Sequence, residues 1–510
     1  MTTTLLKYIT MKKTILLLLI ALPFTINAQL TFELNGVIDK KISSSLIKGK
    51  NVELNSIDKD EYGYYKAKIS CSDKEETVDL KQLDRITFTP KNLREFWQLQ
   101  GIKSEVYESI IKSGLQYKLR KELEDEALEY INYVENNGLL FDDSYLESYL
   151  YSLIYKIYPD RLNDGRPGIL NIHIIKDLSP NAFIFPNGSL FITTGLFSTI
   201  NSEEELIGVL AHEVSHFVLD HSIININKAT ARQNRAEFWA AFATGVAAAA
   251  DIYAASNNQY YTPGALTMGT AILAYSIAES VNQRFGLQYS REQEMEADKC
   301  ANELMKYIKV NPTALSSALA KIKDYCIITG NYLALTGEGT HPAIDERIKA
   351  IGQPVKFNDI KYDKTISFIN TFNAVLEFNN QHFATCKMLA ERNILANVAT
   401  EEDYLMLAMV TIYMYDNEER NLEALRLINT AKQISVYPTI NQSKQEAIVL
   451  IRLQKYDEAK SSLIKYRELL DKENSNLEKI NNQREWSLIK NYIDKEYEWT
   501  QKMINKVSKL

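Results

Sequence analysis

The sequence has few cysteines, no excess of basic residues and no apolar run as long as the ~20 residues that a membrane-spanning helix needs. Four cysteines in 510 residues are too few for a disulfide-built scaffold. The formal net charge is −7 and no basic stripe follows the chain, which argues against a nucleic-acid partner. With 45% hydrophobic and 24% charged residues, the composition excludes a wholly disordered, collagen-like or polytopic membrane protein.

The cysteines, Cys71, Cys300, Cys326 and Cys386, leave two interpretations open. A disulfide between Cys300 and Cys326 is compatible with an exported chain. Alternatively all four are buried free thiols, because cysteine often serves as an ordinary core residue. Their spacing indicates no metal cluster.

The first 28 residues have the order of a secretory signal peptide. Two lysines precede an apolar segment at 14–23, and a small residue, Ala28, marks the expected cleavage point. We therefore expect an exported protein in the periplasm or another extracytoplasmic space. Apolar runs rich in alanine and other small residues lie within 238–280 and leave two roles open, a helical hairpin over the active-site cleft or contact with a membrane.

Periodicity predicts an α+β fold in which a mainly helical core contains a small sheet. Residues 29–90 alternate apolar and polar positions between turn formers, which predicts a small β domain of an SH3-like kind. Residues 91–355 are mainly helical in pattern and form the second domain. The strand-like runs of this domain are 169–175, 181–185 and 188–193.

The remaining residues, 356–510, show helical spacing and a weak internal repeat. Ala424 and Ala459 occupy related positions 35 residues apart, close to the tetratricopeptide period of about 34 residues. A degenerate third copy lies at 381–389. Stacked helix pairs of this type form a binding surface for a protein partner, whereas a plain helical bundle would only support the preceding domain.

A histidine motif on a helix carries the most chemical information. Ser202 and Glu205 predict a capping box at the start of this helix. His212 and His216 lie four residues apart and therefore share a helix face, with Glu213 beside them. Imidazole pairs of this spacing bind zinc, whose bound water loses a proton near neutral pH and can pass it to the adjacent carboxylate.

A second acidic motif offers the third ligand. Residues 290–298 open another helix, on which Glu294 and Asp298 share a face. One carboxylate can bind the metal while the other accepts the second ring proton of a ligand histidine. The alternative is an acidic first turn that the helix dipole favours.

Other charged side chains near these motifs have no predicted ligand role. His221 lies one turn beyond His216 and past the ligand face, so we expect a helix-end residue or one that supports a ligand. Glu292 and Glu296 point elsewhere by helical angle. His173 alternates with apolar neighbours and is expected to be structural.

Together the two motifs resemble the gluzincin metallopeptidase family that includes the CAAX prenyl protease, the bacterial heat-shock membrane protease and the periplasmic β-barrel-assembly-enhancing protease. The similarity covers about residues 95–355 and includes the segments 181–188, Thr194-Gly195-Leu196 and Thr340-His341-Pro342. A secreted form with a helical-repeat tail is most similar to the periplasmic members, although the N-terminal β domain departs from them.

The resemblance implies a zincin protease core with one zinc ion per chain and assigns roles to the matching residues. The residues that would bind zinc are His212, His216 and Glu294. Asp298 would support a ligand. The residues that would act on the substrate are Glu213 as general base, His341 and Arg347 facing substrate or metal, and Asn181, Ala182 and Phe183 as the substrate-pairing edge.

The expected reaction is metal-assisted peptide hydrolysis of unfolded or misassembled envelope proteins. Glu213 would take the proton of the attacking water and pass it to the leaving amine, and His341 or Arg347 would stabilise the oxyanion. The alternative is a chaperone or scaffold that binds partners through its C-terminal helices and has a closed or regulatory zinc site. His341 could close the site by occupying the fourth zinc position.

Overall fold

The structure is a computed structural model whose chain divides into two compact units, Met1–Tyr117 with Leu162–Gly165 and Lys118–Arg161 with Arg166–Leu510. The described residues are 30–72, 74–110, 115–136, 139–162, 166, 168–226, 289–329, 344–479 and 483–509. The expected signal peptide, the segment 238–280 and His341 lie outside the described residues.

The first unit contains an antiparallel five-stranded sheet with strand order β4-β3-β2-β1-β5. Alternation in the sequence explains it, since every second side chain of β1 points into the core. Its elements are β1 (Leu30–Ile38), β2 (Asn51–Lys59), β3 (Tyr65–Cys71), β4 (Lys74–Asp79), a 3₁₀ turn (Leu80–Arg85) and β5 (Ile86–Phe88), followed by α2 (Leu93–Lys103) and α3 (Tyr107–Ile110).

The helix α2 belongs to the core of this unit. Asn92 caps it by accepting a hydrogen bond from the Glu95 amide, and Leu99 and Ile102 pack with the buried residues of the sheet. The unit therefore extends beyond residue 90, where the strand pattern ends. The β region is confirmed, and its SH3-like character stays a prediction.

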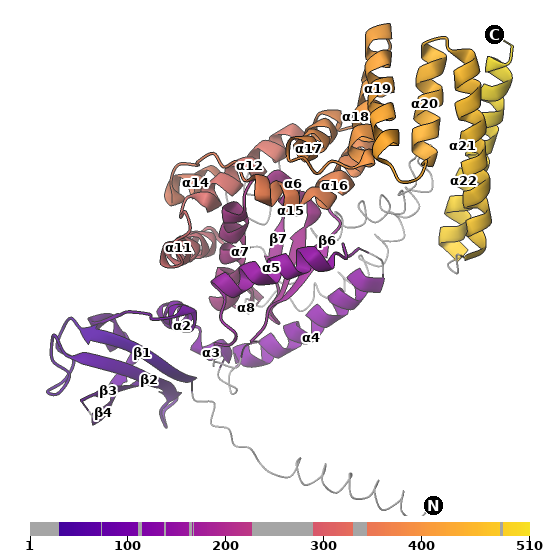
Figure 1. The fold of residues 1–510 in the computed structure, drawn as a ribbon. Helices are drawn as coiled ribbons and strands as arrows, with labels where there is room; N and C mark the ends of the chain where they lie inside the picture. The colour runs from indigo at the N-terminus through magenta and orange to yellow at the C-terminus, as the bar shows by residue number, and fades with distance from the viewer. Residues whose placement is uncertain are drawn as a thin grey trace, which may run out of the picture. The chain divides into compact units, whose positions relative to one another are not determined.

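The second unit contains a three-stranded sheet of order β6-β8-β7, drawn in magenta tones in Figure 1. The strands β6 (Asn171–Ile175) and β8 (Ser189–Thr193) are parallel, and β7 (Ala182–Ile184) is antiparallel to β8. Gly188, at φ 82°, closes the turn between β7 and β8, where its amide donates to the Phe185 carbonyl. The three expected strand-like runs are thus confirmed.

Helices pack against this sheet and against one another. The helix α7 packs against β7 and lies between α11 and α12, and Gly208 permits the close approach to α12 because a Cβ there would meet the Leu315 backbone at 2.9 Å. These helices are α4 (Leu115–Asn136), α5 (Ser144–Ile157), α6 (Thr194–Thr199), α7 (Glu203–Val218), α8 (His221–Ile226), α11 (Arg291–Tyr307), α12 (Ala314–Thr329), α14 (Ile344–Ile351) and α15 (Ile360–Thr365).

The C-terminal part of the second unit is helical throughout its described residues, and consecutive helices pack against each other (Figure 1). Ala424 and Ala459 are fully buried, as small residues at helix contacts. The tetratricopeptide-like character stays a prediction. The helices are α16 (Ser367–Asn379), α17 (Phe383–Leu395), α18 (Glu401–Met414), α19 (Glu418–Ile434), α20 (Ile440–Arg452), α21 (Tyr456–Asn476) and α22 (Gln483–Val507).

The C-terminal helices join the rest of the unit through polar contacts with α6 and the residue that follows it. Asn373 on α16 donates to the Thr194 carbonyl at 2.8 Å, and Arg392 on α17 donates to the carbonyls of Ser198 and Ile200.

All four cysteines are buried free thiols, so the Cys300–Cys326 disulfide does not form. In the described part of the chain, no helix is both long and apolar enough to span a membrane.

Candidate metal centre

The helix α7 that carries the histidine motif is fixed at both ends. Ser202 accepts the Glu205 amide at 3.2 Å, but the Glu205 carboxylate accepts from the Asn201 amide and pairs with Lys321. The second half of the expected capping box, a hydrogen bond from the Ser202 amide to the Glu205 carboxylate, is therefore absent. The buried Glu205 carboxylate binds Asn201 and Lys321 instead. At the other end, Arg166 donates to the carbonyls of the last turn.

Two helices bring the three expected ligands together. Ligand atoms of His212 and His216 on α7 and of Glu294 on α11 all lie within 4.8 Å of one another, and the three residues are buried. The Nε2 atoms of the two histidines are 3.0 Å apart, and carboxylate oxygens of Glu294 lie 3.4 and 3.5 Å from them. Glu213, between the two histidines in sequence, is also buried.

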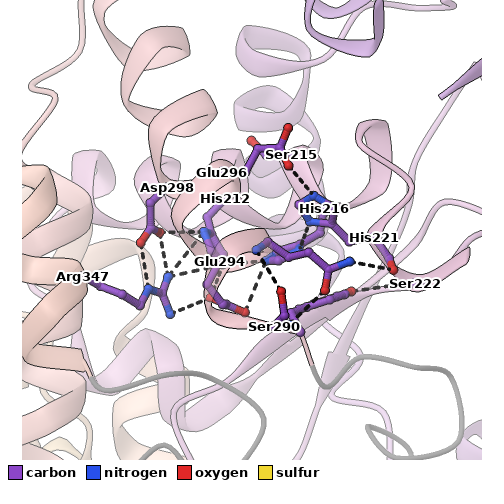
Figure 2. Close-up of polar contacts among 12 residues, drawn as sticks. His212, Ser215, His216, His221, Ser222, Ser290, Glu294, Glu296, Asp298 and Arg347 are labelled. Carbon is purple, nitrogen blue, oxygen red and sulfur yellow. Dashed lines mark hydrogen bonds and ion pairs between the residues drawn. The ribbon is translucent and has the colours of Figure 1, made fainter. Parts of the chain in front are cut away.

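Asp298 and Arg347 support the first histidine (Figure 2). Asp298 Oδ1 lies 2.9 Å from His212 Nδ1, which leaves Nε2 directed at the other ligands. Arg347 on α14 donates from Nε and Nη2 to the two Asp298 oxygens, each at 2.8 Å, and its Nη1 lies 2.9 Å from Glu294 Oε2. Arg347 thus contacts the two α11 carboxylates of this cluster, Glu294 and Asp298.

The electrostatics of this group follow from burial and pairing. Burial and Arg347 would lower the pKa of His212, but hydrogen bonds to Asp298 and Glu294 outweigh them and raise it to about 9. Burial would raise the pKa of Asp298, but Arg347 and the hydrogen bond from His212 hold it below its usual value. Metal binding must therefore displace a proton that the carboxylates retain on His212.

The second histidine has different neighbours. The Tyr289 ring stacks on His216 with centroids 3.7 Å apart and an angle of 13°. His221, the first residue of α8, places its Nδ1 2.8 Å from His216 Nδ1. Glu296, predicted to point elsewhere, lies with Oε2 3.4 Å from His221 Nε2. The sequence contains no signal for the Tyr289 stack, because it joins residues far apart in the chain.

The charge balance of the centre fits a divalent cation. Three buried carboxylates, Glu213, Glu294 and Asp298, face one buried guanidinium, that of Arg347. When both histidines are neutral, as metal binding requires, two negative charges remain uncompensated in a low-dielectric interior, which is costly without a cation. Without a metal, the proton on His212 offsets one of these charges. Two imidazoles and a carboxylate are a donor set that zinc accepts in a site open to water.

The expected substrate edge lies on β7. Ala182 and Phe183 belong to this strand, which forms an edge of the three-stranded sheet, and Asn181 precedes it. The Thr193 hydroxyl accepts from the Asn181 amide at 2.9 Å and fixes the start of the strand. The helix α6 packs closely against the segment that precedes β7, because a Cβ on Gly195 would meet the Leu178 carbonyl oxygen at 1.9 Å.

The two remaining histidines of the described chain have structural partners. His173 stacks on Phe191 across the sheet, with centroids 4.8 Å apart, and burial lowers its pKa. His382 Nδ1 lies 2.7 Å from Glu377 Oε2.

Comparison with known proteins agrees with this geometry. Residues 152–355 match the model of peptidase family M48. The chain is similar to the mitochondrial metalloendopeptidase OMA1 of Schizosaccharomyces pombe, with 26% identity over 42% of this chain and 54% of that protein. It is 28% identical to the protease HtpX of Legionella pneumophila over 37% of this chain and 63% of that protein.

A third relative covers more of the sequence. The beta-barrel assembly-enhancing protease of Yersinia pestis is 23% identical over 66% of this chain and 57% of its own length. The chain thus spans somewhat more than half the length of these curated relatives. The match of residues 152–355 to the model of peptidase family M48 confirms the gluzincin resemblance of the two motifs.

Proposed function

We propose that this protein is an exported zinc-dependent endopeptidase that hydrolyses unfolded or misassembled envelope proteins. The observation that carries the proposal is the convergence of His212, His216 and Glu294 in a buried cluster, with Glu213 on the same helix. Envelope substrates are proposed from the expected signal peptide and from the similarity to a relative whose name refers to β-barrel assembly.

His212, His216 and Glu294 would hold the metal, and Glu213 would move the proton. The zinc ion, when bound, supplies Lewis-acid polarisation of the scissile carbonyl and acidifies water. Glu213 accepts the proton of the attacking water and donates it to the leaving amine. The edge formed by Asn181, Ala182 and Phe183, at the start of β7, pairs with the substrate main chain, which adds as a further strand.

The contacts of Arg347 favour one of its two expected roles. Its guanidinium is buried and engaged by Asp298 and Glu294. We therefore assign Arg347 to holding the carboxylates of Glu294 and Asp298, and we assign oxyanion stabilisation to His341.

Replacement of the general base tests the proposal. Glu213→Gln should bind zinc as the unaltered protein does but lose about 10²–10⁴-fold in the rate of casein cleavage, because proton transfer is lost. Metal analysis and digestion with and without chelator complete the measurement. Cleavage that survives both chelator and Glu213→Gln would refute the assignment as a zinc peptidase with Glu213 as its general base.

A pocket also supports binding of a protein partner by the C-terminal helices. It has a volume of about 760 Å³ and lies between α6 and α12 on one side and α15 to α17 on the other. Its lining includes the exposed apolar side chains of Ile328, Met388 and Leu395. Apolar pockets with exposed rims are typical of ligand and protein contacts.

This pocket is the observation that favours the chaperone or scaffold alternative. Under that alternative, the protein would bind zinc and protect an unfolded outer-membrane protein from aggregation without cleaving it. Leu395→Asp should then abolish protection and leave zinc content unchanged. Chelator-sensitive cleavage of the same substrate would decide for the peptidase.

A further inference from the structure

His221 and Glu296 lie beside the expected metal ligands, and neither has a part in the proposed reaction. His221 is 1% exposed and begins α8 directly after the turn that ends α7. Asp220 makes this turn with φ 54°, a left-handed conformation that Asp tolerates better than most residues, and pairs with the buried Arg120. The turn returns the chain so that the His221 ring meets that of His216, with centroids 4.9 Å apart.

The requirement for a metal ligand determines where the proton of His216 must be. Its Nε2 faces His212 Nε2 at 3.0 Å and Glu294 Oε1 at 3.5 Å, so Nε2 is the atom that must present a lone pair to a cation. A neutral imidazole carries one proton, which then belongs on Nδ1. His216 Nδ1 lies 2.8 Å from His221 Nδ1, within hydrogen-bonding distance.

The same reasoning extends to His221. If His216 donates from Nδ1, His221 must accept at its own Nδ1 and carry its proton on Nε2. That Nε2 lies 3.4 Å from Glu296 Oε2, an acceptor on α11. The opposite order, in which His221 donates to His216, would place the proton of His216 on Nε2 and block metal binding.

We propose that His221 is a positioning residue that selects the metal-binding tautomer of His216, with Glu296 favouring the corresponding tautomer of His221. The proposal uses the metal site of the proposed function and names residues outside its ligand set. Two contacts hold the pair of histidines in place for this role. Tyr289 stacks on the His216 ring and fixes its plane, and Gln293 donates to the backbone carbonyl of His221 at 3.3 Å.

The two ligand histidines are therefore oriented by different chemistry. Asp298 can only accept a proton from His212 while it is ionised, so it imposes one tautomer. His221 can either donate or accept, and Glu296 must bias it. The side chain of Glu296 is about half exposed, at 47%, so we expect its bias to be weaker than that of the buried Asp298.

Zinc affinity, measured by competition with a chromophoric chelator, tests the proposal without reference to proteolysis. His221→Leu removes the acceptor and should weaken zinc binding about 10–100-fold, the usual loss for partners of ligand histidines. His221→Gln restores an acceptor oxygen and should recover most of the affinity. His173→Leu, in the sheet, is the matched control and should bind zinc as the unaltered protein does.

The outcomes separate this proposal from the proposed function. If the unaltered chain binds no zinc, the proposed function fails. If it binds zinc and His221→Leu binds equally well, or if His221→Gln is as weak as His221→Leu, the positioning role is refuted while the peptidase assignment stands.

Nitrogen-15 NMR of the unaltered, zinc-loaded full-length chain covers the case in which His221→Leu does not fold. We expect protons on His216 Nδ1 and His221 Nε2. A proton on His221 Nδ1 would overturn the proposal.

Discussion

Buried charge is balanced differently in the metal centre and in the C-terminal helices. In the metal centre, Glu213, Glu294 and Asp298 are buried with one guanidinium, that of Arg347. In the C-terminal helices, Lys444 on α20 is buried 2.8 Å from Glu496 on α22, one base for one acid. The Tyr466 hydroxyl also donates to Glu496.

The difference distinguishes a binding site from a structural contact. A balanced pair is satisfied by the folded chain alone, and replacing it with apolar residues is often neutral. An excess of buried carboxylates is satisfied only by an added cation or by protons. We infer that the metal centre depends on solution conditions for its stability, whereas the Lys444–Glu496 pair does not.

The largest effect on stability is expected from removing the buried guanidinium of the metal centre, that of Arg347. Arg347→Met leaves Asp298 and Glu294 buried without their guanidinium and should cost about 3–5 kcal/mol of unfolding free energy in chelator. A bound divalent cation would offset part of this cost, so the loss should be smaller in zinc. Urea unfolding in both conditions measures it.

Arg347→Lys is the matched control for this variant. It keeps the charge but not the two-pronged contact with Asp298, and should fall between Arg347→Met and the unaltered protein. Equal losses for Arg347→Met in zinc and in chelator would contradict the charge argument.

Metal withdrawal should have the next largest effect. A ligand that binds only the folded state stabilises it by about 4 kcal/mol at a free concentration 1,000 times its Kd. Thermal unfolding of the zinc-loaded and chelator-treated protein should therefore differ clearly. The same comparison with Glu294→Gln, which removes a ligand, should show a much smaller difference. If the unfolding temperature of the unaltered protein is the same with zinc and with chelator, the protein has no such site.

Asp177 is a third case of buried charge, in which a single carboxyl group takes up a proton and not a metal cation. Burial raises the pKa of Asp177 from 3.8 to about 6, although its carboxylate accepts the Ser179 amide. Since the folded pKa is the higher one, the folded state binds more protons between these values. Stability is therefore full below pH 4 and falls as the pH rises to about 6, by about 3 kcal/mol.

Asp177→Asn tests this pH dependence. The amide keeps an oxygen that can accept the Ser179 amide but does not ionise. The variant should match the unaltered protein at pH 4 and be up to about 3 kcal/mol more stable at pH 8, as measured by urea unfolding. Asp416→Asn, at a largely exposed carboxylate, should show no such divergence. Parallel pH profiles for Asp177→Asn and the unaltered protein would disprove the account.

The smallest effect is expected from replacing the whole buried charged group of the C-terminal helices. Replacing the whole group, with Lys444→Met, Glu496→Met and Tyr466→Phe together, leaves no buried partner unsatisfied and should change stability by about 1 kcal/mol or less. Lys444→Met alone should lower the free energy of unfolding by about 3–5 kcal/mol, because it leaves the Glu496 carboxylate buried without its cationic partner. Denaturant unfolding compares the two. A large loss in the triple variant would show that this group stabilises the fold as a charged network.

The sequence predicted those parts of the site that depend on local geometry. The spacing of His212 and His216 determines a shared helix face, and the same holds for Glu294 and Asp298. The strands around the turn at Gly188 were predicted from alternation and turn residues. Each of these features depends on residues within one or two turns of each other, so a single sequence contains enough information to identify them.

Contacts between distant elements were not predictable in the same way. The capping interaction expected within α7 is replaced in part by a pair between Glu205 and Lys321 on α12. The helix α2 comes after the strands of the first unit in the sequence, but it packs into the core of their five-stranded sheet. Glu296 reaches the site through His221, although its helical angle points it away from the ligands.

By itself, the sequence predicted two histidines and a carboxylate as candidate ligands, their spacing on two helices and Glu213 as candidate general base. It also determined that strand-rich and helical regions are both present. Only the tertiary structure decided that α14 brings Arg347 between two carboxylates and that the turn at Asp220 places His221 on His216. Helical periodicity is imposed by backbone hydrogen bonds over a few residues. The packing of one helix on another depends on side-chain complementarity across the whole core, which spacing along the chain does not encode.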